Sequence, residues 1–202
     1  MATEAKTLLT HGAIDENFLS EYFTGDVPED GAIPANLAYI GDGIETIEPK
    51  QDDKKNSKAY YNTGGQEVTT ITGSTRSLDI SGDRSIGDPA QDMIASLASK
   101  TGSSRNKWFR ENQYIMGEDG NLQLIESKTG TVTYSDITDK GGSATDPGSF
   151  KATATYTAVP KTLSADDEKD ITALTQVLTE TPSINAEILQ VTATVKGAPT
   201  GE

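Results

Sequence analysis

The feature that most constrains this chain is an alternation of apolar and polar residues with a period of two. Only a β-strand places every second side chain on the same face. The alternation is clearest in residues 150–159, where one face carries Phe150, Ala152, Ala154, Tyr156 and Ala158. Strings of threonine with valine or tyrosine, such as residues 131–134, suit the same pleated geometry. The sequence therefore predicts a mainly β fold.

Other segments have strand-like patterning: residues 38–40, 44–47, 68–80, 107–116, 122–126, 131–137 and 187–196. Gly73 is a candidate β-bulge within residues 68–80. Lys128-Thr129-Gly130 separates two of the segments and predicts a hairpin turn. Three stretches rich in Gly, Pro or polar residues are predicted to be long loops, namely residues 25–34, 49–65 and 139–148.

One α-helix is indicated at about residues 88–100. Asp88 can cap its N-terminus, Pro89 suits the first helical position, and Gln91 completes a pattern like a capping box. Lys100 in the last turn and Gly102 as a left-handed stop would end it.

Charge is distributed unevenly along the 202 residues, which carry a formal net charge of −14. Residues 1–53 carry a net charge of −10, residues 54–110 of +4, and residues 111–202 of −8. Because DNA affinity comes from clustered Lys and Arg, so acidic a chain is not a typical DNA-binding domain. The basic middle predicts complementarity between neighbouring copies or segments, and an unevenly charged solvated surface is the alternative.

No set of catalytic or metal-binding residues stands out. The chain has no cysteine and one histidine, His11, which excludes disulfides and thiolate zinc sites and argues against a Ser-His-Asp triad. Acidic stretches such as residues 136–146 could offer oxygen ligands but match no EF-hand loop. The N-terminus lacks a signal-peptide pattern, and no apolar run approaches the ~18 residues of a membrane span. We therefore expect no enzyme, no cofactor, no metal and no membrane association.

Residues 78–97, LDISGDRSIGDPAQDMIASL, resemble the strand-to-helix segment of a known family. The match centres on Gly87-Asp88-Pro89-Ala90-Gln91-Asp92. The family is the major tail tube proteins of long non-contractile-tailed phages (siphophages) of Gram-positive bacteria. Its strand-rich layout fits about residues 35–160.

The resemblance implies a β-sandwich or rolled sheet with one flanking α-helix, about 88–100, long loops and extended termini. Residues 1–36 would be an N-terminal arm, and residues 37–160 the tail-tube β domain. Residues 161–202 would be a C-terminal extension. Within it the residues themselves, apart from the resemblance, predict a helix over residues 165–179, capped by Ser164 and with Ile171, Leu174 and Leu178 facing inward, and a strand over residues 187–196. A mobile C-terminal arm is the alternative to that helix.

The function implied by the resemblance is that of a structural virion protein. Copies would close into homo-hexamer rings, and the rings would stack by self-assembly into the tail tube. The tube would be the conduit for the tape-measure protein and then for DNA during DNA ejection, without binding DNA specifically. Tail-end proteins would be further partners, with the virion as the location and the host cytoplasm as the place of assembly. The alternative is a solitary β-sandwich binding module for a carbohydrate or cell-surface ligand.

Two groups of residues are candidates for roles in such a tube. The lumen-facing acids would be Glu45, Glu48, Glu67 and Asp79. The inter-ring loop would use Asp52, Asp53, Lys54, Lys55 and Lys58. An ordinary solvated loop is the alternative for the second group.

Overall fold

A computed structural model of the chain describes residues 17–29, 34, 36–116, 122–165, 169–180 and 194–195. Most of this part of the chain belongs to strands, so the predicted mainly β fold is confirmed. The strands follow the order β2-β1-β5-β6-β7-β4-β3, with β8 and β9 paired to β6 off this path. Every pairing in the main path for which a register is given is antiparallel. Two compact units make up the chain, and β6 runs from one into the other.

The first unit comprises residues 1–41, 108–130 and 160–202. Its described elements are η1 (Asn17–Leu19), β1 (Ser20–Gly25), β2 (Ala38–Tyr39), most of β5 (Asn106–Met116), the first half of β6 (Leu122–Thr138), β8 (Lys161–Ser164), α2 (Ile171–Glu180) and β9 (Thr194–Val195). β1 lies between β2 and β5, so its backbone is paired on both edges. The predicted strand over residues 187–196 lies outside the described residues except for β9.

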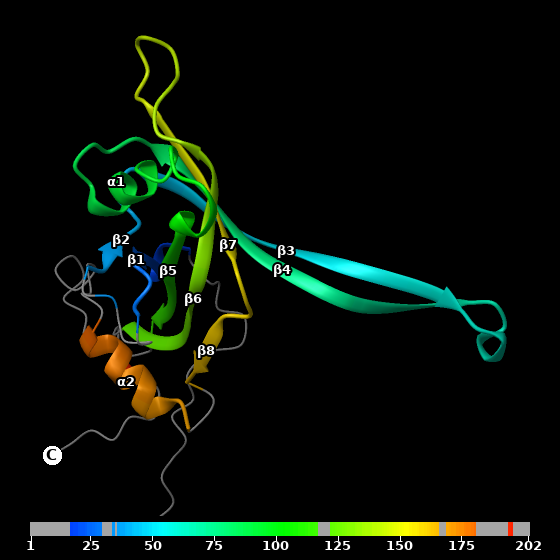
Figure 1. The fold of residues 1–202 in the computed structure, drawn as a ribbon. Coiled ribbons are helices and arrows are strands. Elements are labelled where there is room, and N and C mark those ends of the chain that lie inside the picture. Colours follow the sequence, from blue (N-terminus) through cyan, green and yellow to red (C-terminus); the bar gives the residue numbers. More distant parts are fainter. Residues whose placement is uncertain are drawn as a thin grey trace, which may run out of the picture. The chain divides into compact units, whose positions relative to one another are not determined.

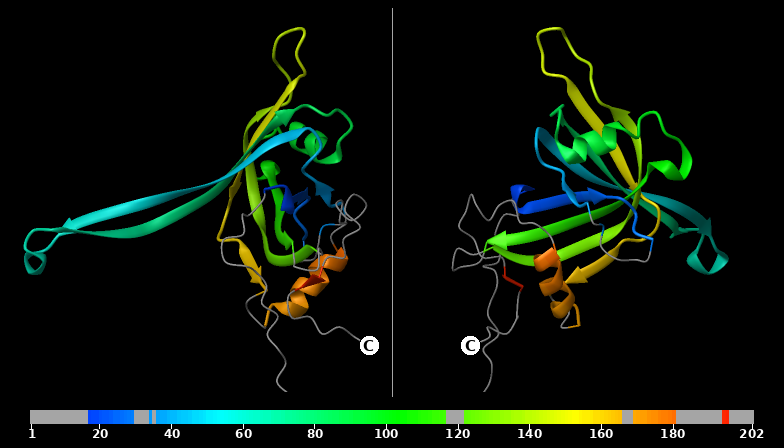
Figure 2. Two further views of the ribbon diagram at one scale, coloured as in Figure 1. Left: turned by 180° about the vertical axis from the view of Figure 1, so that it is seen from behind. Right: turned by 60° about the vertical axis from the view of Figure 1, so that its left-hand side comes forward.

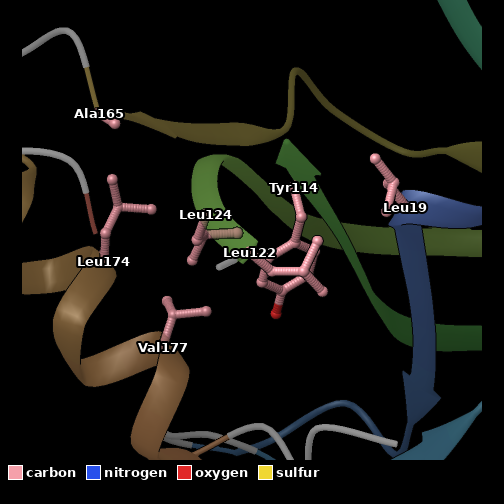
Figure 3. Close-up of a cluster of buried hydrophobic side chains, with 7 residues drawn as sticks. All are labelled: Leu19, Tyr114, Leu122, Leu124, Ala165, Leu174 and Val177. Carbon is pink, nitrogen blue, oxygen red and sulfur yellow. The ribbon is translucent and has the colours of Figure 1, made fainter. Parts of the chain in front are cut away.

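Leucines from separate elements form the core of this unit, drawn in Figure 3. The buried cluster contains Leu19, Tyr114, Leu122, Leu124, Ala165, Leu174 and Val177. α2 contributes Leu174 and Val177, three residues apart on one helical face. The predicted helix over residues 165–179 is present but begins at Ile171, so the predicted cap by Ser164 is wrong. Ser164 ends β8, and its N–H donates to Asp170 Oδ2 at 3.1 Å. The side chains of Ile171 and Leu178 lie outside the described part.

The second unit comprises residues 42–107 and 131–159. Its elements are β3 (Ile44–Ala59), η2 (Tyr61–Thr63), β4 (Glu67–Asp83), α1 (Pro89–Ala95), η3 (Gly102–Arg105), the second half of β6 and β7 (Ser149–Tyr156). The alternation predicted for residues 150–159 is confirmed over β7, where Phe150, Ala152, Ala154 and Tyr156 are buried. Beyond β7 the chain turns away, and Ala158 and Val159 are exposed.

The hairpin turn predicted at Lys128-Thr129-Gly130 is wrong, because β6 runs unbroken through these residues. Their backbone pairs with β8, in the register Lys128↔Thr162 and Thr129↔Lys161. The pairing partner lies more than thirty residues away in the sequence, so local turn chemistry could not show it.

The helix predicted for residues 88–100 begins where expected but is shorter, since α1 ends at Ala95. After Ala95 the backbone tightens to hydrogen bonds between residues three apart, such as Lys100 N–H to Leu97 O at 2.9 Å. The Arg105 guanidinium then donates to the carbonyls of Ala98 (3.0 Å) and Lys100 (2.6 Å). A side chain from beyond the helix, rather than Gly102, therefore satisfies these last carbonyls.

In the part of the chain that the structure describes, no helix combines the length and the apolar character that crossing a membrane requires.

Candidate functional site

The two longest strands of the second unit extend beyond their sheet as an arm. β3 and β4 pair from Ile44↔Gly82 to Ala59↔Glu67, whereas β7 pairs with β4 only over residues 77–83. Figure 1 shows β3 and β4 continuing together past β7 to a turn at their far end, and both views of Figure 2 show the same two-stranded ribbon. We call residues 51–76 the arm. Along it, each strand has only the other as its pairing partner among the described strands.

The long loop predicted for residues 49–65 is therefore wrong over residues 49–59, which belong to β3. The error has a physical cause. A half-buried strand is recognised in a sequence by alternating apolar residues. The arm buries neither face, and residues 51–58 are accordingly all polar, so no such alternation is present. Only the turn at residues 60–66 is loop-like, and it contains η2.

Cross-strand partners share a face, so the register assigns the charged side chains of the arm to two sides. One side continues the face of Glu48 and Asp79 and carries Asp52, Lys54 and Lys58. The other side continues the face of Leu78 and Ile80 and carries Asp53 and Lys55. The Ser57 and Thr69 hydroxyls, 2.8 Å apart, are partners in the same register. The five predicted inter-ring residues thus all lie on the arm but face two directions.

A β-bulge interrupts the arm halfway along. Lys54 pairs with Gly73 and Lys55 with Ile71, which leaves Thr72 as an extra residue on β4. The Thr72 hydroxyl donates to the Lys54 carbonyl at 3.2 Å. The predicted bulge at Gly73 is thus confirmed to within one residue, and the extra residue bends the strand that carries it.

The far end of the arm presents two tyrosines to solvent. Tyr60 is 52% exposed and Tyr61 fully exposed. The turn behind them is held by Thr63, whose hydroxyl oxygen lies 2.8 Å from the carbonyl oxygens of both Tyr60 and Gln66 and donates its one proton to either of them. Gly64 follows with a φ of 64°, a conformation that suits a residue without a Cβ. The exposed aromatic rings therefore sit on an ordered turn.

Two of the four predicted lumen acids lie side by side at the base of the arm. Glu48 and Asp79 are cross-strand partners. Asp79 forms an ion pair with Lys50 and accepts a hydrogen bond from the Thr153 hydroxyl at 2.7 Å. The Lys50 hydrogen bond, then that from Thr153, lowers the pKa of Asp79, and the same contact raises the pKa of Lys50. Asp79 therefore stays ionised, but an internal cation offsets its charge.

The other two acids lie at opposite ends of the hairpin. Glu45 is the extra residue where the pairing shifts between Ile44↔Gly82 and Thr46↔Ser81. Glu67 begins β4 at the far end of the arm, opposite Ala59. The structure thus groups Glu48 with Asp79 and separates Glu45 and Glu67 from them.

An open depression of about 400 Å³ lies over this polar face of β3, β4, β6 and β7. Its lining includes Glu48, Asp79, Asp136 and Lys151. Asp136 belongs to a further bulge, where the register shifts between Ser135↔Thr153 and Thr138↔Lys151, and its φ is 50°. Asp accepts this left-handed conformation more readily than most residues. The sequence offered no signal for this bulge, and the mixed charges of the lining do not define a ligand.

The start of α1 is built around Gln91, which is 1% exposed. Asp88 caps the helix by accepting a hydrogen bond from the Gln91 N–H at 2.7 Å, and Pro89 is the first helical residue. The Gln91 side chain does not form a capping box. It donates to the carbonyls of Asp42 (2.7 Å) and Asp83 (3.1 Å) and accepts from the Ser85 N–H (2.8 Å). Gln91 thus joins the turn before β3, the end of β4 and the loop before α1.

A buried polar group that the sequence did not reveal lies in the first unit. Glu21 on β1 is 1% exposed and faces Asn112 on β5. Burial raises the pKa of Glu21, and a hydrogen bond with Tyr114 opposes the shift. Burial and the neighbouring Glu21 also raise the pKa of Tyr114. Asn112 in turn accepts a hydrogen bond from the Ser127 hydroxyl at 2.8 Å.

Within the described residues no group of three or more His, Cys, Asp or Glu side chains is placed to hold a metal ion. The described surfaces that distinguish the molecule are therefore the arm, its tyrosine tip and the polar face at its base.

Comparison with known proteins identifies the fold. No protein-family model matches the sequence, and no curated protein matches it. Among solved structures, the chain is similar to one described as "Tail of empty GTA particle computed with helical refinement, C6 symmetry", with a TM-score of 0.50 and 12% identity over 73% of this chain and 98% of that one. It is also similar to one described as "Cryo-EM structure of the anti-feeding prophage cap (AFP tube terminating cap)", with a TM-score of 0.51 and 10% identity over 81% of this chain and 99% of that one. At such low identity these likenesses show the fold alone, and the fold of this chain is of the tail-tube type.

Proposed function

We propose that the chain is a structural tail protein whose copies assemble into a tube, and that the arm is the main contact between copies. The observation that carries this proposal is the arm itself. It is a long two-stranded ribbon that supplies none of the buried core side chains in the described part of the chain, and it exposes Val68 (44%) and Ile71 (58%) as well as Tyr61. An isolated hairpin is marginally stable in water, so a surface that covers the arm in the assembly would stabilise it.

The charge of the arm supports a second copy as its partner. The arm carries four cations, Lys54, Lys55, Lys58 and Arg76, against three acids, Asp52, Asp53 and Glu67, so its net charge is +1. The rest of the chain is strongly acidic, since the total is −14. The outer part of the arm, residues 54–73, has a net charge of +2, and its contact with the acidic surface of a neighbour would be complementary, which favours specific association.

The finer features are also proposals. They are a hexameric ring, a lumen that guides the tape-measure protein and DNA, tail-end partners, and residence in a siphophage virion. The resemblance of residues 78–97 to major tail tube proteins supports them, as does the tail-tube-type fold. Glu48 and Asp79 are the predicted lumen acids that share one face, and we propose that this face lines the channel. The five charged residues of the arm would then serve contacts between rings.

The test is an arm-less variant. Asp53 and Ser74 are cross-strand partners, so replacing residues 54–73 with Asn-Gly closes a shorter hairpin with a favoured two-residue turn. Negative-stain electron microscopy of the wild-type chain should show tubes or stacked rings, and the variant should show neither. Thermal unfolding is the control. Among the described residues no buried core side chain comes from the arm, so both proteins should unfold at similar temperatures. Tubes of normal length from the variant would remove the arm from assembly.

A monodisperse wild-type chain that binds glycans would instead support the solitary binding module.

A further inference from the structure

A row of buried polar side chains crosses three neighbouring strands of the first unit. Glu21 on β1 is 1% exposed, and both its cross-strand partner Asn112 on β5 and Ser127 on β6 are fully buried. The Ser127 hydroxyl donates to Asn112 Oδ1 at 2.8 Å. Burying polar groups costs free energy unless they are hydrogen-bonded. The attachment of β1 to β5 therefore depends on the state of these polar groups as well as on apolar packing.

Glu21 is the member of this row that can change its charge. Burial raises the pKa of the Glu21 carboxyl, and the hydrogen bond with Tyr114 only partly opposes the shift. A carboxyl group removed from water keeps its proton to a higher pH than an exposed glutamate does. The stability that the neutral carboxyl allows is therefore complete at acidic pH and is lost as pH rises through the raised pKa.

The charged and titratable groups that face Glu21 in the described part of the chain come from the two strands beside β1. The register places Tyr39 of β2 and both Arg110 and Tyr114 of β5 on the same face as Glu21. β6 contributes Ser127, which does not titrate, and α2 contributes only apolar side chains to the core around Tyr114. Any charge that forms on Glu21 must therefore be offset by this small set of groups.

These groups are poorly suited to offset it. Burial is the main cause that raises the pKa values of Tyr39 and Tyr114, so both remain neutral phenols when Glu21 loses its proton. The guanidinium of Arg110 lies over the Trp108 ring, 4.9 Å from its centroid. An arginine that neutralised the carboxylate would lower the pKa of Glu21, whereas burial keeps that pKa raised. Ionisation of Glu21 therefore places a poorly compensated charge between two strands.

We propose that Glu21 is a pH-sensitive latch between β1 and β5: the neutral carboxyl holds β1 in place, and its ionisation loosens β1 locally. β1 is suited to local release, because only the two-residue β2 lies beyond it in the strand order. Release would uncover the edge of β5 that pairs with residues 20–25, and an uncovered strand edge can accept another strand. The proposal is independent of the proposed function, since it concerns how firmly one chain holds its own strand.

Hydrogen exchange of the full chain at pH 5 and pH 8 tests the latch. Protection factors are compared, because they remove the pH dependence of exchange in an unstructured peptide, and the concentration is kept low enough that sedimentation shows no assembly. Glu21→Gln keeps a neutral side chain of similar size at both pH values. Glu111→Gln is the matched control, since Glu111 lies on β5 but faces the other side of the sheet, 3.9 Å from Lys128.

We expect the protection of the β1 amides to fall about fivefold or more from pH 5 to pH 8 in the wild type and in Glu111→Gln, while the β7 amides of the second unit keep theirs. Glu21→Gln should protect β1 equally at both pH values. Unchanged protection of β1 in the wild type would overturn the proposal, because Arg110 would then hold the ionised carboxylate in place. An equal fall in Glu21→Gln would also overturn it, because another group would then be responsible.

A second measurement covers the case in which Glu21→Gln does not fold. The carboxyl groups of Glu21 and of the exposed Glu29 are titrated by NMR in the wild-type chain. A higher midpoint for Glu21, with the β1 amide signals changing at the same pH, supports the latch. A midpoint for Glu21 no higher than that of Glu29 would overturn it.

Discussion

Replacing Gln91 with alanine removes the side chain that joins three backbone segments of the second unit. The backbone carbonyls of Asp42 and Asp83 lose a donor, and the Ser85 N–H loses an acceptor. An unsatisfied buried polar group costs about 1–3 kcal/mol, and these groups are only partly buried, so the low end applies. Three such groups give a loss of about 3 kcal/mol in the free energy of unfolding. The helix itself is not weakened, because alanine is the best helix former and the Gln91 N–H still reaches Asp88.

Urea unfolding followed by circular dichroism measures the stability difference. Thermal unfolding should show a fall of about 6–12 °C, since 1 kcal/mol corresponds to about 2–4 °C in a chain of this size. Gln51→Ala is the matched control, because Gln51 is exposed on the arm and its side chain bonds only to Asp53 in the described contacts. We expect that control to change stability by less than about 0.5 kcal/mol.

Hydrogen exchange locates the effect, because the Ser85 amide loses its acceptor and should exchange much faster in Gln91→Ala. The reasoning would be refuted if the variant unfolded like the wild type and the Ser85 amide remained protected. In that case water would satisfy the three groups as well as the side chain does.

Three further outcomes follow from the described geometry. Because burial raises the pKa of Glu21, the native state holds its proton more tightly than the unfolded state does, and stability falls as pH rises through the raised pKa. Glu21→Gln should therefore gain stability relative to wild type between pH 4 and pH 8 in urea titrations. Because Lys50 and Thr153 lower the pKa of Asp79, the contribution of this carboxylate to stability is present above its unfolded-state pKa and is lost as pH falls through its folded-state pKa. Any stability difference between wild type and Asp79→Asn should therefore shrink at acidic pH and in high salt. A Cβ at Gly82 would lie 2.2 Å from the Gly43 carbonyl oxygen, so Gly82→Ala should lower the free energy of unfolding by about 3 kcal/mol or more. In the same unfolding assay, Gly73→Ala should differ from wild type by less than about 1 kcal/mol, because the nearest atom to its Cβ would be 3.8 Å away.

The sequence predicted best the elements whose burial is regular. β7 and β5 were predicted because one or both of their faces are buried and therefore carry apolar residues. α1 was predicted because Asp88 and Pro89 determine the start of a helix locally. β1 was not predicted, because Glu21 is a buried carboxyl group at a position where an apolar residue would have indicated the strand. In the sequence a glutamate indicates a surface position, and the hydrogen bond between Glu21 and Tyr114 exists only once the fold has brought the two side chains together.

The strands of the arm were not predicted for a different reason: neither face of the arm is buried, so its sequence has no alternation of apolar and polar residues. Its charged residues stand together in the sequence, but only the register separates Asp52, Lys54 and Lys58 from Asp53 and Lys55. Gln91 was predicted as a capping residue from its spacing to Asp88. Its actual partners, the Asp42 and Asp83 carbonyls and the Ser85 N–H, include one 49 residues away, which no local motif encodes.

The Thr72 bulge has a consequence for how the arm can vary. The two edges of the ribbon differ in length by one residue, so the ribbon must curve, as a strip does when one side is longer than the other. Deleting Thr72 would make Lys54↔Gly73 and Lys55↔Ile71 ordinary neighbours and leave every other cross-strand pair as it is. The extra residue Thr72 thus determines the curvature of the arm, whereas the paired residues determine which side chains are available for contacts. A one-residue insertion or deletion could change the reach and angle of the arm while each side chain kept its partner and its face.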